Sequence, residues 1–326
     1  MTGKRVVMAT ALALLAAGLI PLSTASAKVP GPNGRIAFSQ FDPAFEQKST
    51  YTINPDGTAL RRLFERGSEL AHWAPWGRQI AIFCCDDGMV AHIINPDTQR
   101  FRELPSHYPA LELHCGFSWS RDGRLACETF GVTDPRLTGI YSMRSRDGRG
   151  LRRITTNPGG DDIPGDYSPN GRNLVFIRMN QRGNIAGLFV KTLGIGRAHR
   201  ITPPGFLTLG DSRGSWSPQG NKIVFATQTA PNRQPSLWIV RADGSQLHRL
   251  HIPRDCGGLA SDPQAVGCFQ PSWSPNGHRI AFVRSNPGGG VDIYTVSAEG
   301  HGLIRVTRSG RAVEPDWGPH PLIHSG

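Results

Sequence analysis

Residues 270–285 read QPSWSPNGHRIAFVRS, and this stretch decides the fold. It combines an aromatic residue, a Ser-Pro pair, an Asn-Gly pair and an alternating apolar run. Asn-Gly favours the positive φ angles of a two-residue hairpin turn, and alternation is typical of a half-buried strand. The window therefore predicts two antiparallel strands joined by a tight turn.

The same pattern occurs six times along the chain, with intervals of 46, 48, 49, 57 and 44 residues between its aromatic anchors. The anchors are Trp73, Trp119, Tyr167, Trp216, Trp273 and Trp317. After each anchor comes a third apolar segment and then a second turn, usually of the Asp-Gly type. Each unit thus predicts four short strands, and such units at this spacing are typical of a β-propeller.

The two ends of the propeller sequence complement each other. Residues 31–38, GPNGRIAF, form the second part of the motif without its aromatic half, and residues 314–319, EPDWGP, form the aromatic half alone. Pairing the two would finish one blade and leave no open sheet edge. We therefore expect an all-β, six-bladed propeller of four-stranded antiparallel blades, closed by pairing of the N- and C-terminal strands.

This pattern resembles the WD40-like repeats of the TolB-type β-propeller family. The resemblance rests on the W-S-P-[DN]-G-x-x-I-x-F and D-G-x-x-x-R-[IL] halves and extends over essentially the whole mature chain. It implies a propeller that docks another envelope protein. TolB itself carries an α/β domain before its propeller, and we expect this chain to lack that domain.

The first residues are typical of a secretory signal. Lys4 and Arg5 precede a short apolar stretch, and Ala25-Ser26-Ala27 offers a cleavage site. We expect a signal peptide over 1–27, a propeller over 28–320 and a tail over 321–326. The mature protein would be secreted, periplasmic or part of the cell envelope, without stable membrane insertion.

The formal net charge of +11 raises the possibility of nucleic-acid binding. However, five arginines occupy one repeat position, just before the apolar residue of the fourth strand, and the remaining unit has Glu103 there. Charged side chains on an outer strand discourage edge-to-edge pairing, so we expect a structural role and no nucleic-acid partner. These arginines are Arg62, Arg153, Arg200, Arg249 and Arg305.

Six cysteines in an exported chain predict disulfides. Cys256 and Cys268 flank one Gly-rich loop, and a bridge between them is the simplest interpretation. For Cys115 we favour a bridge to Cys84 or Cys85, with independent thiols or a metal site as alternatives. Cys127, in an apolar strand, is expected as a buried free thiol.

Two local patterns could carry catalysis. GDSRG, residues 210–214, matches the G-x-S-x-G pattern of serine hydrolases, but Ser212 precedes a strand rather than a helix. Near the cysteines, Asp and His lack zinc-ligand spacing. Asp161 and Asp162 could help to bind a cation, although a solvated acidic loop is the favoured interpretation. We expect no catalytic residue, resident metal or cofactor.

The leading hypothesis is a monomeric, non-enzymatic scaffold that binds an envelope or extracellular protein, peptide or polymer on one face. The alternative is a metal-assisted hydrolase or lyase at the channel mouth. The candidate face carries the segments 84–88, 110–116, 157–165, 203–214 and 253–271. Candidate binding residues on this face and at the channel mouth are Asp86, Asp87, His114, Asp161, Asp162, Asp166, Asp211, Arg213 and Asp316.

Overall fold

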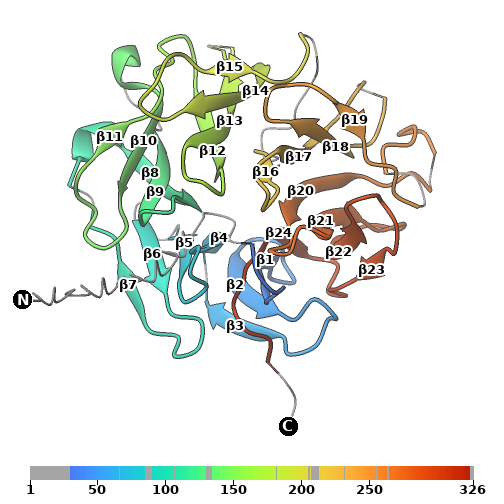
Figure 1. Cartoon of the computed structure of the whole chain (residues 1–326). Coiled ribbons are helices and arrows are strands. Elements are labelled where there is room, and N and C mark those ends of the chain that lie inside the picture. Colours follow the sequence, from blue (N-terminus) through green and yellow to red (C-terminus); the bar gives the residue numbers. More distant parts are fainter. Residues whose placement is uncertain are drawn as a thin grey trace, which may run out of the picture.

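The computed structural model describes residues 30–323, except 66, 85–89, 106, 130–133, 181, 205, 207–212, 231, 254–255 and 263. Six four-stranded antiparallel sheets form a ring, with one edge of each sheet toward the centre (Figure 1). This confirms the six-bladed propeller expected from the repeats. The expected signal peptide, 1–27, lies outside the described residues.

The blades are numbered in chain order, and strands are given from the channel outward. Blade 1 has β24 (Ala312–Trp317), β1 (Ile36–Phe41), β2 (Lys48–Ile53) and β3 (Arg61–Phe64). Blade 2 has β4 (Ser68–Trp73), β5 (Ile80–Cys84), β6 (Val90–Ile94) and β7 (Phe101–Glu103). Blade 3 has β8 (Leu113–Trp119), β9 (Arg124–Thr129), β10 (Ile140–Arg144) and β11 (Arg152–Arg153).

The other three blades follow the same order. Blade 4 has β12 (Asp162–Tyr167), β13 (Asn173–Met179), β14 (Ile185–Thr192) and β15 (His199–Arg200). Blade 5 has β16 (Ser215–Trp216), β17 (Lys222–Thr227), β18 (Ser236–Arg241) and β19 (His248–Arg249). Blade 6 has β20 (Cys268–Trp273), β21 (Arg279–Ser285), β22 (Val291–Ser297) and β23 (Ile304–Arg305). Two 3₁₀ turns, η1 (Pro109–Leu111) and η2 (Pro135–Leu137), are the helices in the described part of the chain, and neither could cross a membrane.

The aromatic anchors pack between neighbouring blades. Trp273 of blade 6 contacts a cluster that includes Val224 and Ile239 of blade 5, and Tyr167 of blade 4 packs with Ala126 and Ile140 of blade 3. All six anchors are at most 5% exposed. Each anchor therefore buries a large apolar surface at the interface of two blades, as expected for packing rather than ligand binding.

The turn in the repeated motif is longer than expected. In blade 6, Ser274 N donates to Arg279 O at 2.9 Å, so the loop between them has four residues instead of two. Gly277 alone has a positive φ there, 76°, which is the pattern of a longer hairpin loop. Ser274 Oγ also accepts from Arg279 N at 2.9 Å. The serine of the Ser-Pro pair therefore stabilises its own turn rather than the neighbouring blade.

The two ends of the propeller pair as expected. β24 and β1 are antiparallel, with Trp317 opposite Ile36 and Ala312 opposite Gln40. Just after β24, the His320 imidazole stacks on the Trp73 indole of blade 2, with ring centroids 5.1 Å apart. The tail is also held, because Asn54 Nδ2 donates to Ile323 O at 2.7 Å.

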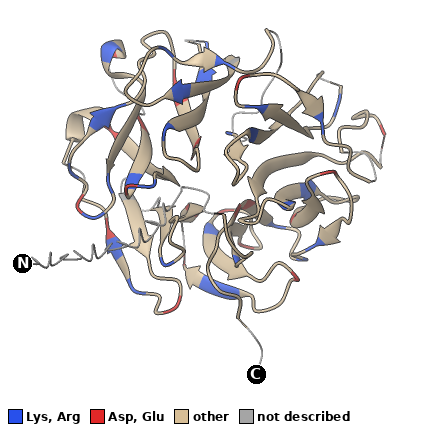
Figure 2. Ribbon diagram, viewed as in Figure 1, with Lys and Arg blue, Asp and Glu red and all other residues tan. Residues whose placement is uncertain are grey.

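Positive charge is distributed around the ring, and it includes the outer strands (Figure 2). The five repeated arginines and Glu103 all lie on outermost strands, as the repeat position predicted. Their guanidinium groups bond locally: Arg153 Nη2 donates to Thr138 O at 2.7 Å, and Arg305 Nη2 pairs with Asp292 at 2.6 Å. This arrangement supports a structural role for these charges.

The closure of the ring predicts a specific sensitivity at Gly318. A Cβ on this glycine would overlap the Trp73 indole, so Gly318→Ala must displace that side chain. Overpacking of this kind costs about 1–3 kcal/mol. Thermal and urea unfolding should show this loss, whereas Gly159→Ala, where nothing lies within 4 Å of the added methyl, should leave stability nearly unchanged. Equal stability of the two variants would contradict the close contact.

Candidate functional site

One side chain per blade, directly before the aromatic anchor, faces the central channel. Several of these side chains link neighbouring blades. Trp317 N donates to Ser272 Oγ at 3.0 Å, and Trp73 N donates to Asp316 Oδ2 at 2.8 Å. Ser272 Oγ also donates to Asp316 Oδ1 at 3.1 Å. The channel wall is thus part of the fold's own hydrogen-bond network, a role that sequence reasoning missed.

Two small cavities follow the channel. The inner one, of about 20 Å³, is lined by anchors and by His72, Ser118, Asp166 and Asp316. The wider one, of about 70 Å³, lies toward the beginnings of the innermost strands, and we call it the channel mouth. Its lining includes His72, Asp166, Arg213, Gln270, Glu314 and Asp316. Asp166, Arg213 and Asp316, three of the candidate residues, therefore come together here.

The acidic groups at the mouth are compensated within the protein. Lys48 Nζ lies 2.6 Å from Glu314 Oε1 and 2.5 Å from Glu69 Oε2, and Leu70 N donates to Glu314 Oε2 at 3.0 Å. Burial opposes ionisation of Glu314, but the Lys48 charge and these hydrogen bonds hold the pKa of this carboxyl below its usual value. Glu314 is therefore a charged, fixed part of the wall.

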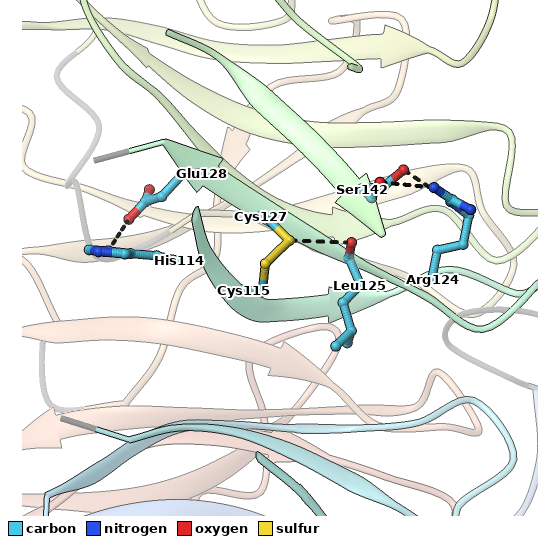
Figure 3. Close-up of a disulfide and its surroundings, with 7 residues drawn as sticks. All are labelled: His114, Cys115, Arg124, Leu125, Cys127, Glu128 and Ser142. Atoms are coloured by element: carbon cyan, nitrogen blue, oxygen red, sulfur yellow. Dashed lines mark hydrogen bonds and ion pairs between the residues drawn. A yellow bond between two sulfur atoms is a disulfide. The ribbon is translucent and has the colours of Figure 1, made fainter. Parts of the chain in front are cut away.

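A second group of titratable residues lies at one end of blade 3. His114 and Glu128 are cross-strand partners, with 3.9 Å between Nδ1 and Oε1, next to the disulfide (Figure 3). Burial raises the pKa of Glu128 to about 7, with Arg213 lowering it and Asp161 raising it further. Burial likewise lowers the pKa of His114. Burial therefore favours the neutral form of both partners.

Glu128 was not among the residues selected from the sequence. It lies opposite His114 only because of the irregular register of the β8–β9 hairpin, for which the sequence carries no clear signal. His114 itself, 8% exposed, is in neither channel cavity. The electrostatic influence of Arg213 on Glu128 nevertheless connects this pair to the channel mouth.

The remaining acidic candidates do not gather into one site. Asp162 is 2% exposed and pairs with Arg178 at 2.7 Å, so its expected place in a solvated loop is wrong. The reason is its position at the start of β12, directly opposite Arg178. Asp161 is exposed. Asp86, Asp87 and Asp211 lie outside the described residues, as does Ser212.

The residues that the structure describes form two disulfides. Cys256 is bonded to Cys268, the pair favoured by the sequence. Cys115 is bonded to Cys127 rather than to Cys84 or Cys85, and Cys127 is not a free thiol. The physical reason is that Cys115 and Cys127 face each other across β8 and β9, with Cα atoms 4.0 Å apart. Two disulfides are compatible with an exported protein.

Within the ranges that the structure describes, no group of three His, Cys, Asp or Glu side chains could hold a metal ion. The channel candidates illustrate why. Asp316 already accepts hydrogen bonds from Trp73 N and Ser272 Oγ, and the ring positions of blades 3, 5 and 6 carry serine. A cation would have to compete with these bonds.

The buried Glu128 predicts a pH-dependent stability. Between pH 4.5 and about 7 the unfolded chain loses this proton while the folded chain retains it, so wild-type stability falls as pH rises through this window. Glu128→Gln removes this contribution. As pH rises from 4.5 to about 7, the free energy of unfolding of the variant should therefore increase by ~1–3 kcal/mol relative to that of the wild type. Urea unfolding across this pH range measures the difference. His114 titrates in both proteins, so a difference independent of pH would contradict the assignment to Glu128.

The chain is similar to known proteins in sequence and in fold. No protein-family model matches the sequence. An uncharacterised protein of Agrobacterium fabrum is 27% identical over 196 residues, which is 57% of this chain and 57% of that protein. The Tol-Pal system protein TolB of Francisella tularensis subsp. mediasiatica is 19% identical over 294 residues, covering 76% of this chain and 61% of TolB.

The crystal structure of TolB from Acinetobacter baumannii superposes with a TM-score of 0.69 at 21% identity, over 87% of this chain and 66% of that one. The chain spans 57% to 61% of the length of the two curated relatives. Its fold and channel define a six-bladed β-propeller closed through its terminal strands. Within that class, the chain is similar to TolB proteins in sequence and in fold.

Proposed function

We propose that this chain is an exported, non-enzymatic scaffold that docks an extended segment of an envelope protein across the channel mouth. The similar Francisella protein is named as part of the Tol-Pal system, which favours a protein partner. The signal-like N-terminal sequence and the two disulfides support an exterior location. The propeller supplies the rigid support that such recognition requires.

The size of the channel mouth carries the proposal. Its cavity of about 70 Å³ is far below the ~300–1,000 Å³ of pockets that enclose small molecules. Such a cavity admits one protruding side chain of a partner, and the rest of the partner would lie across the face. Recognition would then come from several shallow contacts contributed by different blades.

The mouth is already ordered for such contacts. Gln270 Oε1 accepts from Glu314 N at 2.9 Å, and Glu314 is held by Lys48 at 2.6 Å. Because these groups are fixed before binding, a partner would not lose affinity to their ordering. Arg213, half-buried in the same wall, places a positive charge beside Asp166 in the lining of the cavity.

Site-specific photo-crosslinking tests this surface. A photoreactive amino acid at Gln270 should give a discrete adduct with an envelope protein, and the same group at the exposed Arg241 should not. Adding Arg213→Glu should reduce the Gln270 adduct about tenfold, because a reversed charge in the interface weakens binding. The matched control is Arg241→Glu, which should leave the adduct unchanged. Equal adducts at both positions, or none at Gln270, would contradict docking at the mouth.

A further inference from the structure

A cavity of about 700 Å³ is lined by residues of blades 3 and 4, away from the channel mouth. It lies beside the turn that joins β8 and β9, at the Arg124 and Ser142 end of blade 3. Figure 3 shows His114 and Glu128 on the other side of the Cys115–Cys127 disulfide from this end. Its volume is within the range of ligand sites in proteins.

The aromatic anchor at this junction differs from the other five. Tyr167, which lines it, is the one anchor that is not tryptophan. The other anchors fill their junctions with the larger indole. Tyr167 is only 1% exposed, so its ring still packs between the blades, but it fills less space than an indole would.

The cavity wall is strongly cationic. Its charged side chains are Arg121, Arg124, Arg152, Arg153 and Lys191, against the single carboxylate of Asp122. Asp122 accepts a hydrogen bond from Ser120 Oγ at 2.5 Å. No ion pair with Asp122 neutralises these cations within the described part of the chain. Five positive groups around one cavity form a field that attracts anions.

Three of the five cations are engaged by the fold. Arg124 donates to Ser142 Oγ at 3.1 Å and to Ser142 O at 2.8 Å. Arg279 makes equivalent bonds to Thr295 in blade 6, so this use of arginine is structural. Lys191 donates to carbonyls of its own turn, and Arg153 donates to Thr155 O at 3.0 Å.

The guanidinium groups of the other two, Arg121 and Arg152, have no hydrogen bond or ion pair with any residue that the structure describes. They come from different segments of blade 3, the β8–β9 turn and the outer strand β11. Burial lowers the pKa of Arg124, and the positive charge of Arg152 lowers it further. The positive charges of Arg124 and Arg152 therefore repel each other across this wall.

We propose that the cavity between blades 3 and 4 binds a tetrahedral oxyanion, a phosphate or sulfate group, through Arg121 and Arg152. Guanidinium groups donate paired, charge-assisted hydrogen bonds that suit such oxygens. Arg124 and Lys191 add positive charge to the wall while remaining bound to the scaffold. The group could belong to a free phosphorylated solute or to an anionic envelope polymer, which share this chemistry.

Calorimetric titration with inorganic phosphate, at ionic strength held constant with sodium chloride, tests the site. The wild-type chain should bind with a measurable Kd, and Arg121→Gln with Arg152→Gln should weaken binding at least about tenfold, as expected for losing a charge-assisted bond. The control is Arg182→Gln with Arg241→Gln, which removes the same charge from two exposed arginines outside the cavity. This control should bind as wild type does.

A polyphosphate chain distinguishes the sources. If polyphosphate binds more tightly per phosphate group than inorganic phosphate does, the natural ligand is an anionic polymer. If the two bind equally per phosphate group, the ligand is an isolated oxyanion. A second readout needs no variant: on titration, the Nε–Hε signals of Arg121 and Arg152 should shift in the NMR spectrum of the wild-type chain. The proposal is overturned if neither probe binds, if the control loses as much affinity as the cavity variant, or if these signals do not move.

Discussion

The antiparallel pairing of β24 with β1 is the constraint on which the propeller depends. Without it, β1 would present unpaired N–H and C=O groups as an open edge, and blade 1 would lack its innermost strand. Trp317 would also lose its place between blades 6 and 1, where it is 1% exposed. Closure is reinforced by the contact of His320 with Trp73, so that blades 1 and 2 share one network at the seam.

Several side chains that line the channel also hold neighbouring blades together. Three residues before the anchors accept a hydrogen bond from the backbone of the adjacent blade: Ser215, Ser272 and Asp316. Asp316, a candidate binding residue in the sequence, is therefore engaged before any partner arrives. The two proposed binding sites lie where the repeat departs from its regular pattern. These are the mouth, with Arg213 and Glu314, and the junction where Tyr167 replaces tryptophan.

The sequence was sufficient for the ring, its blade count and its seam, because these depend on a repeated pattern and on two complementary ends. It was insufficient where strand register decides the contact. A symmetric β8–β9 hairpin with Trp119 opposite Leu125 would place Cys127 opposite residue 117. The irregularity between Cys115 and Trp119 shifts the pairing by two residues and brings the two cysteines together.

The pairing of Asp162 with Arg178 depends on register in the same way, since the two residues face each other across β12 and β13. Their separation in sequence gives no hint of this contact. The raised pKa of Glu128 is a further case, because it depends on burial of the side chain and on the charges of Asp161, just before blade 4, and Arg213, just before blade 5. The repeats therefore predict the scaffold well. The contacts and pKa shifts at positions where the chain departs from the repeat follow only from the coordinates.

Hydrogen exchange of the backbone amides tests closure most directly. If β24 and β1 form one sheet, amides of Ala312–Trp317 should be protected together with those of Ile36–Phe41, and to the extent seen in interior strands such as β21. The two segments should also lose protection in a single step as denaturant is added. Rapid exchange across Ala312–Trp317 in an otherwise protected propeller would show that the seam is open and would contradict the account.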